Sequence, residues 1–179
     1  YWQFEVEVAT ALQQRISFTP ISSQQQFKAK EIFNQLFTDS SDLTPDWQQV
    51  AVANALGRRL SIISGGPGTG KTYTVSRLLA TLQGVYNGQL KILMAAPTGK
   101  AAQRLKQSIT AAREDLKKLS IAPTILNAIP QEAATLHRLL GFRPQSLKLS
   151  YDKKHPLRCD VLLIDEVSMI DLPMMARIL

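Results

Sequence analysis

The chain has 179 residues, of which 45% are hydrophobic and 20% charged, and its formal net charge is +7 at pH 7. This length and composition are typical of one α/β domain, alone or with a small appendage, and they exclude a disordered chain. No apolar run approaches the ~20 residues of a membrane span, the start lacks the pattern of a signal peptide, and Cys159 is the only cysteine, so we expect a cytoplasmic protein without membrane segments.

The positive charge is concentrated in the middle of the chain. Residues 91–158 contain 13 Lys and Arg against 4 Asp and Glu, a net charge of +9. A basic region favours a polyanionic partner, most simply nucleic acid. A solvated, lysine-rich face would give the same count, so charge alone leaves both interpretations open.

Residues 1–44 are expected to form a helical lead-in or linker. Two apolar patterns at helical spacing cover residues 4–16 and 27–37, and residues 20–23 between them predict a turn and a helix cap. Residues 38–44 are polar and turn-like, which indicates a domain boundary. No residue in this part suggests chemistry.

A second structural unit is expected to begin with a helix over residues 45–56. Asp46 or Thr44 would cap it, with Pro45 in its first turn. Gln48 lies 17 residues before Gly65. Its amide both donates and accepts a hydrogen bond, which matches the N6 and N7 atoms of adenine. Gln48 is therefore a candidate adenine contact, and an ordinary exposed helix glutamine is the alternative.

The segment from Gly65 to Thr72 has the P-loop pattern, G-x-x-x-x-G-K-[ST]. The pattern requires a preceding strand, expected over residues 60–63, and a following helix, expected over residues 72–82. Glycines let backbone N–H groups approach phosphate oxygens without an intervening side chain. The expected ATP-binding residues are Gln48, Gly65, Gly66, Pro67, Gly68, Thr69, Gly70, Lys71 and Thr72. Among these, Lys71 would reach the β- and γ-phosphates and Thr72 would ligate Mg²⁺.

A second strand is expected over residues 90–96, after a turn at residues 86–88, and a helix over residues 101–119. Ligands of parallel sheets bind beyond the carboxyl ends of the strands. Pro97, Thr98 and Lys100 would lie at such an end, where a hydroxyl and an ammonium group suit a nucleic-acid phosphate. A simple strand-to-helix turn is the alternative.

The next segments carry weaker signals. Residues 121–133 contain two prolines and are expected to form a loop, and residues 134–141 a short helix that contains His137. No second histidine or cysteine stands at metal-ligand spacing, so no zinc site is expected. Residues 142–158 are basic and poor in apolar residues, which favours a solvated loop over a hairpin.

A third buried strand is expected over residues 159–164, followed directly by Asp165 and Glu166. An aspartate at the end of an apolar strand accepts hydrogen bonds from Mg²⁺-bound water, and the next carboxylate can orient and deprotonate the attacking water. Together with the P-loop, these acids predict an ATPase in which Lys71, Asp165 and Glu166 are catalytic and Thr72 and Asp165 hold Mg²⁺. The fold class is α/β, a parallel sheet flanked by helices.

Four stretches in this order resemble the RecD-type helicases of superfamily one, which move 5′→3′ and include the α subunit of exodeoxyribonuclease V. The stretches are residues 62–72, 95–102, 135–141 and 164–175. The resemblance implies that residues 45–179 are the first RecA-like motor domain of a P-loop NTPase, incomplete and truncated after the Walker B motif at Asp165 and Glu166. It also implies that Pro97, Thr98, Lys100, Thr135 and His137 grip single-stranded DNA, and that RecB and RecC are partners in double-strand-break repair.

The resemblance leaves several functions open. The family's later motifs, with the arginine fingers, lie outside this chain, so we expect weak nucleotide binding without unwinding or useful ATP turnover. A stand-alone RecD-like helicase is a close alternative, and a non-catalytic docking fragment is another. A P-loop kinase or GTPase is disfavoured, because the guanine-binding N-K-x-D pattern is absent and adjacent acids suit hydrolysis by water.

Overall fold

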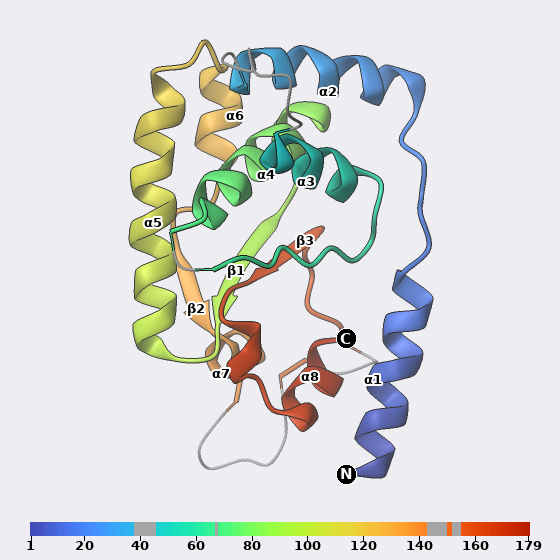
Figure 1. Cartoon of the computed structure of the whole chain (residues 1–179). Coiled ribbons are helices and arrows are strands. Elements are labelled where there is room, and N and C mark those ends of the chain that lie inside the picture. Colours follow the sequence, from blue (N-terminus) through green and yellow to red (C-terminus); the bar gives the residue numbers. More distant parts are fainter. Residues whose placement is uncertain (38–45, 67, 143–149, 152–154) are drawn as a thin grey trace. The chain divides into compact units, whose positions relative to one another are not determined.

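The computed structural model describes residues 1–37, 46–66, 68–142, 150–151 and 155–179 (Figure 1). The chain forms two compact units. The sheet unit contains Tyr1–Ala11, Lys91–Ser108 and Pro130–Leu179, and the helical unit contains Leu12–Leu90 and Ile109–Ile129. Helices α1 (Trp2–Arg15) and α5 (Gly99–Lys117) contribute residues to both.

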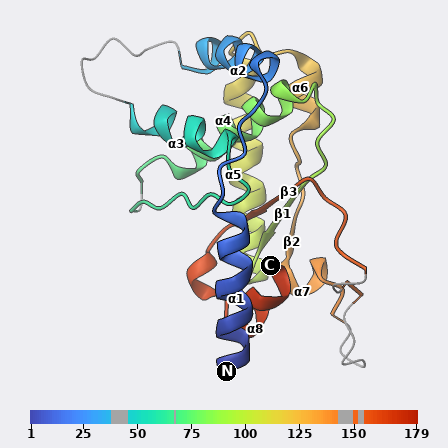
Figure 2. The ribbon, with the colours of Figure 1, turned by 90° about the vertical axis from the view of Figure 1, so that its right-hand side faces the viewer.

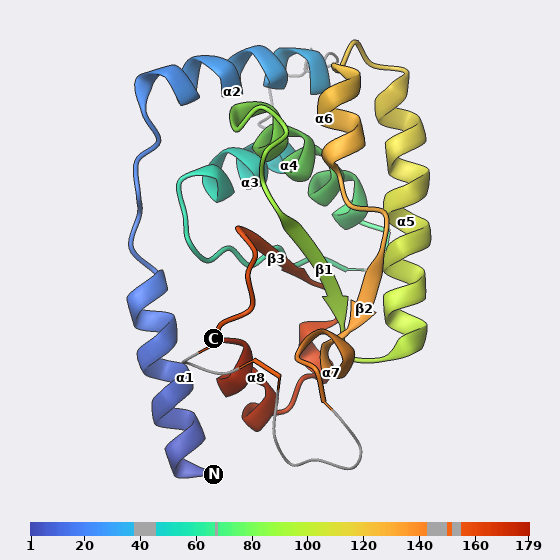
Figure 3. The ribbon, with the colours of Figure 1, turned by 180° about the vertical axis from the view of Figure 1, so that it is seen from behind.

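Three parallel strands form the sheet, in the order β2-β1-β3 (Figure 3). The central strand β1 (Ile92–Ala96) pairs with β2 (Ala133–Thr135) on one side and with β3 (Val161–Ile164) on the other. Its neighbours make β1 almost fully buried, which explains why its sequence is a continuous apolar run. The parallel sheet confirms the expected α/β class.

The core of the sheet unit is built from one end of the sheet and two short helices. Helix α7 (Leu136–Leu139) follows β2 directly, and α8 (Leu172–Ile178) follows the 3-10 turn Val167–Met169. The buried members of this core are Ala95, Leu136, Leu140 and Met174. Burying such side chains stabilises the unit by about 1.5–3 kcal/mol for each large one.

Small residues mark the junction of β1 and α5. Ala96, Ala101 and Ala102 are buried together, and Ala133 of β2 packs against them. Their short side chains allow the first turn of α5 to lie close to the sheet. This junction fixes where the segment after β1 leaves the sheet.

The helical unit is organised around α4 (Lys71–Val85), which contacts α2 (Ser23–Leu36), α3 (Trp47–Leu56) and α6 (Pro123–Ala128) (Figure 2). Helices α2 and α4 approach closely at Gly84, where an added Cβ would overlap the Ile32 side chain. The expected turn and cap before α2 are confirmed, since the Ser22 hydroxyl accepts from the Gln25 backbone and the Gln25 side chain from the Ser22 backbone. Asp46 caps α3 as expected.

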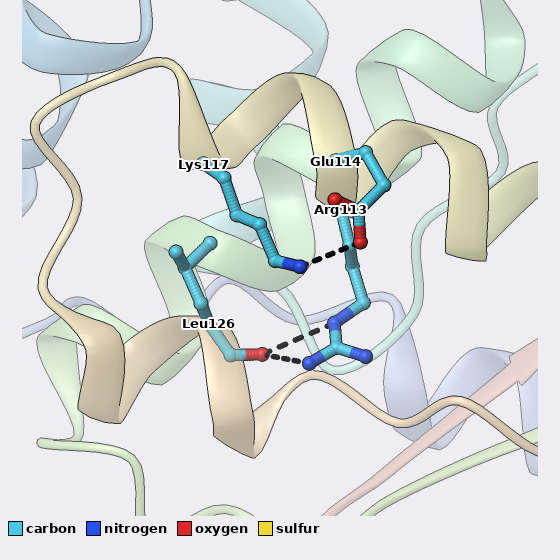
Figure 4. Close-up of polar contacts among 4 residues, drawn as sticks. All are labelled: Arg113, Glu114, Lys117 and Leu126. Atoms are coloured by element: carbon cyan, nitrogen blue, oxygen red, sulfur yellow. Dashed lines mark hydrogen bonds and ion pairs between the residues drawn. The ribbon is translucent and has the colours of Figure 1, made fainter.

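Two buried polar side chains connect segments of the helical unit. The guanidinium of Arg113 on α5 donates two hydrogen bonds to the Leu126 carbonyl at the end of α6, at 2.9 and 3.2 Å (Figure 4). The Gln83 side chain donates to the carbonyls of Leu90 and Ala128 and accepts from the Leu90 N–H. Gln83 thus satisfies backbone groups of Leu90 and Ala128, and Arg113 adds donors to a carbonyl that also accepts from the Ile129 N–H.

Two expectations about secondary structure were wrong. Residues 60–63 form no strand, and Ile62 is 84% exposed. Among the described residues no strand pairs with this segment, so its apolar character is not enough to place it in a sheet. Residues 121–133 were expected to be a loop, but Pro123 begins α6 because proline is tolerated at the first helical position, and Ala133 begins β2.

The remaining expectations were close to the observed elements. The helix expected over residues 134–141 is shorter, because its first residues belong to β2, and the chain turns at Gly141 with φ 69°. The turns at residues 38–44, Pro45, and most of the basic stretch 142–158 lie outside the described residues. No helix within the described ranges is long and apolar enough to cross a membrane.

Candidate nucleotide-binding and nucleic-acid site

The P-loop of the helical unit leads into the N-terminus of α4. Gly70 is the N-cap, and Gly68 and Gly70 have φ of 75° and 80°, a conformation that favours glycine. Lys71 and Thr72 are the first two residues of the helix and are exposed. The helix expected to follow the loop is therefore confirmed, and its backbone N–H groups and dipole favour an anion at this end.

Side chains of the loop hold its conformation. The Lys71 ammonium donates to the Gly65 and Gly66 carbonyls, at 2.7 Å each, and the Thr69 hydroxyl donates to the Gly66 carbonyl at 2.9 Å. A Cβ added at Gly65 would lie 2.5 Å from the Thr69 hydroxyl oxygen, so a side chain at this position would displace that hydroxyl from its place in the loop. An ammonium group has three N–H donors, and two loop carbonyls leave one of them for a ligand.

Gln48 lies against the same loop. Its Nε2 donates to the Thr69 carbonyl at 3.3 Å, and a Cβ added at Gly70 would overlap Nε2. Asp46 fixes the start of α3 by accepting from the backbone N–H groups of Gln48 and Gln49. The structure therefore brings Gln48 to the P-loop across 21 residues of sequence.

The chemistry of the P-loop residues and Gln48 fits a nucleoside triphosphate with Mg²⁺. The loop backbone and Lys71 are donors for phosphate oxygens, the Thr72 hydroxyl is an oxygen ligand, and the Gln48 amide is half-buried beside them. Pro67 lies outside the described residues.

Asp165 and Glu166 belong to the sheet unit. The Asp165 N–H donates to the Ala95 carbonyl at 3.0 Å, so this residue leaves the sheet directly at the end of β3. Glu166 has φ 54°, which is uncommon for a side chain other than glycine, and its N–H donates to the Asp165 carboxylate at 2.9 Å. Glu166 is exposed, so its carboxylate is accessible to water and Asp165 is partly shielded.

The strand register places the expected DNA contacts at one edge of the sheet. Ala96 is opposite Thr135 and Ala95 is opposite Ile164, so the segments after all three strands leave the same edge. Thr98 and Lys100 are exposed there, and so is His137, whose ring lies 4.9 Å from the Phe142 ring. Within the sheet unit, these residues and the Asp165–Glu166 pair share one side.

The two threonines of this edge also have structural roles. The Thr98 hydroxyl accepts from the Ala101 N–H, and the Thr135 hydroxyl accepts from the Arg138 N–H, each at 3.2 Å. Both hydroxyls therefore cap helices, and each keeps its O–H as a donor for another group.

Sequence reasoning missed a cluster on α4 next to the P-loop. The Arg77 guanidinium lies 3.2 Å from the centroid of the Tyr73 ring and donates from Nε to the Leu36 carbonyl at 3.1 Å. Burial lowers the pKa of Arg77, while Tyr73 acts in the opposite direction. The i, i+4 spacing of Tyr73 and Arg77 was the available signal, and the cluster ties α2 to the helix that carries Lys71.

The chain is similar to known proteins over most of its length. The family described as "AAA domain" matches residues 48–179. RecBCD enzyme subunit RecD of Haemophilus influenzae is 48% identical over 157 residues, which cover 86% of this chain and 24% of that protein. The subunit of the same name in Mycolicibacterium smegmatis is 44% identical over 137 residues, 74% of this chain and 24% of that protein.

A relative of a different name is the ATP-dependent RecD2 DNA helicase of Deinococcus radiodurans, 33% identical over 133 residues, which cover 74% of this chain and 15% of that protein. The chain spans about a quarter of the length of the RecD subunits it matches. The resemblance to RecD expected from the four stretches is confirmed. Since the family match covers most of the chain, the chain belongs to the AAA domain family.

Proposed function

We propose that this chain carries the ATP-binding part of a RecD-type DNA helicase, an ATP-hydrolysing subunit of a RecBCD-like (exodeoxyribonuclease V) enzyme. The observation that carries the proposal is the P-loop at the start of α4, where Lys71 and the Gln48 amide both contact the loop backbone. The AAA domain match over residues 48–179 and the RecD relatives support the same function.

In this proposal each half of the chemistry is assigned to residues of one unit. The loop from Gly65 to Thr72 binds the phosphates of ATP, Lys71 neutralises charge on the β- and γ-phosphates, and Gln48 contacts adenine. Thr72 is proposed as a Mg²⁺ ligand in the helical unit and Asp165 as a Mg²⁺ ligand in the sheet unit, and the ion, when bound, would neutralise negative charge on the phosphates. Glu166 accepts the proton of the attacking water, for which its exposed carboxylate is suited.

The partner of the sheet edge would be single-stranded DNA. Thr98, Lys100, Thr135 and His137 would contact its backbone, with Pro97 shaping the turn. The exposure of Lys100 and His137 and the shared strand edge support this assignment. Phosphate contacts of this kind position a strand without selecting its sequence, as a translocating enzyme needs.

The finer assignments rest on the resemblance of the four sequence stretches to RecD-type helicases. RecB and RecC are the proposed partners, movement 5′→3′ the proposed direction and the cytoplasm the proposed location. Residues 1–44 would be the lead-in and residues 45–179 would lie in the first RecA-like motor domain. A stand-alone RecD-like helicase is the second candidate, which the similarity to the ATP-dependent RecD2 DNA helicase favours.

The test is a titration of the chain with a fluorescent ATP analogue and Mg²⁺, with and without oligo-dT. We expect binding that tightens with oligo-dT and weakens at least tenfold in Lys71→Ala, because that variant removes the only side-chain cation of the loop. Circular dichroism checks that the variant is folded. A matched control is Lys91→Ala, an exposed lysine outside the loop.

Analogue binding that is equal in wild type and Lys71→Ala would reject the nucleotide assignment. The chain would then be better described as a docking module. Analogue binding that depends on Lys71 but does not respond to oligo-dT would retain the nucleotide site and reject its coupling to DNA.

A further inference from the structure

Helix α5 has two faces that differ in chemistry along its first half. Ala101, Ala102, Leu105 and Ile109 are buried. The opposite face carries four exposed polar or cationic side chains at positions i, i+3, i+4 and i+7, which lie on one side of a helix: Lys100, Gln103, Arg104 and Gln107. We call these four residues the α5 polar face.

The α5 polar face contains positive charge without a counter-charge. Neither Lys100 nor Arg104 forms an ion pair with any residue in the described part of the chain. The sequence from Lys91 to Arg113 contains no Asp or Glu. An exposed cation pair one helical turn apart is therefore available to an anionic partner.

The second half of the same helix is different. Lys117 pairs with Glu114 at 2.6 Å, and Lys118, just beyond the end of α5, pairs with Asp115 at 2.8 Å. The carboxylate of Asp115 raises the pKa of Lys118, through a hydrogen bond and its charge. Lys106 in the first half, which is outside the α5 polar face, pairs with Glu132 at 2.6 Å. Apart from the buried Arg113, which donates to the Leu126 carbonyl, the cations of α5 outside this face are thus paired with carboxylates.

We propose that the α5 polar face binds the phosphate backbone of single-stranded DNA, with Arg104 as a phosphate contact, and so extends the DNA path beyond Thr98 and Lys100. This inference rests on the proposed function for the identity of the partner. Arg104 lies one turn after Lys100, about 6 Å along the helix axis, so the two cations contact neighbouring parts of one strand. Gln103 and Gln107 supply amide donors beside them.

Charge complementarity selects the phosphate backbone as the occupant. The face has no apolar or aromatic side chain on which bases could stack, so it suits the backbone of the strand. A guanidinium binds phosphate through two parallel hydrogen bonds, which gives Arg104 a contact that glutamine cannot replace.

The experiment measures oligo-dT affinity of the chain by fluorescence anisotropy at several salt concentrations. Each phosphate contact on a single strand contributes about 0.7 to the slope of log K against log salt. Arg104→Gln should weaken binding about fivefold at low salt and reduce the slope by about 0.7, and Arg104→Lys should keep the slope because it keeps the charge. Lys100→Gln/Arg104→Gln should lose about twice as much slope.

The matched control is Lys117→Gln/Lys118→Gln, which also removes two positive charges from the α5 region. Those cations are paired with carboxylates, so oligo-dT affinity should change less than twofold. Equal weakening in both double variants would overturn the inference, because net charge alone would then explain binding. Polyglutamate that competes as well as unlabelled oligo-dT would also overturn it, since the face would then bind any polyanion.

The two proposals fail in different ways. Wild-type binding of oligo-dT that is unaffected by Arg104→Gln rejects the role of the α5 polar face and leaves the proposed function in place. A wild-type chain that binds the ATP analogue but not oligo-dT rejects the DNA partner, and with it this inference.

Discussion

The chain contains the tripeptide Thr-Gly-Lys twice, each time at the start of a helix, and the two copies are held in different ways. Thr98, Gly99 and Lys100 follow β1, which is hydrogen-bonded to a strand on each side, and the Thr98 hydroxyl caps α5. Thr69, Gly70 and Lys71 follow a segment with no strand, and the Thr69 hydroxyl bonds its own loop instead.

The consequence is a difference in what a substitution does. The turn after β1 is fixed by the sheet, so Lys100 is free to face outward and is exposed. The P-loop is fixed by Lys71, Thr69 and Gln48, the residues proposed to bind ATP. Changes in the P-loop therefore alter both its shape and its ligand contacts, whereas a change at Lys100 of the second turn alters contacts only.

The largest expected effect tests the support of the β1 segment. Gln83 is fully buried and holds Leu90, two residues before β1, through both backbone groups. Gln83→Ala leaves the Leu90 and Ala128 carbonyls without this donor, so the free energy of unfolding should fall by about 2–4 kcal/mol. Urea denaturation followed by circular dichroism measures it.

The control for Gln83→Ala is Gln89→Ala, which changes an exposed glutamine next to Leu90. It should change the free energy of unfolding by less than about 0.5 kcal/mol. If Gln83→Ala were as mild, the backbone groups of Leu90 and Ala128 would be satisfied without Gln83.

The second prediction compares the glycines of the two tripeptides directly. Gly70 has φ 80° and its Cβ would overlap Gln48, whereas a Cβ at Gly99 meets no atom within 4 Å. Gly70→Ala should strain the P-loop by about 1–2 kcal/mol, equivalent to about a tenfold loss of ATP-analogue affinity. Gly99→Ala should leave ATP-analogue affinity unchanged, because the added Cβ meets no atom and alanine is well tolerated in a helix.

Both glycine variants are measured with the same analogue titration, and folding is checked by the urea midpoint. If Gly99→Ala weakens analogue binding as much as Gly70→Ala, the two turns do not differ in the way their backbone angles imply. If neither variant changes it, the positive φ of Gly70 is not required for the nucleotide site.

The sequence predicted local structure correctly but did not show which segments pair over a long distance. Periodicity predicted α2, α4 and α5, because a helix makes its own backbone hydrogen bonds and its pattern is local. Residues 90–96 and 159–164 were correctly predicted to contain strands, since their apolar runs are paired in the structure. Residues 60–63 have an equally apolar run without a partner, and pairing over a long distance is not visible in a local pattern.

The site residues show the same limit. Glycine spacing located the P-loop, but the bond from Gln48 to the Thr69 carbonyl depends on how α3 packs beside α4. The hydrogen bond from Arg77 of α4 to the Leu36 carbonyl of α2 also joins separate helices. The sequence identified the residues of the P-loop, but it did not predict the contacts between helices.

The smallest expected effect separates the two roles that Gln48 could have at the P-loop, contact with adenine and support of the loop backbone. Gln48 Nε2 has two hydrogens and one is donated to Thr69, so the amide keeps a donor and its oxygen for adenine. Gln48→Ala should therefore weaken ATP-analogue binding about fivefold, a loss of about 1 kcal/mol, and inorganic tripolyphosphate binding less than twofold, because tripolyphosphate has no base. Calorimetric titration measures both ligands, and Gln49→Ala is the control on the same helix. An equal loss for the two ligands would show that Gln48 acts by supporting the shape of the loop through the Thr69 carbonyl and not by contacting the base.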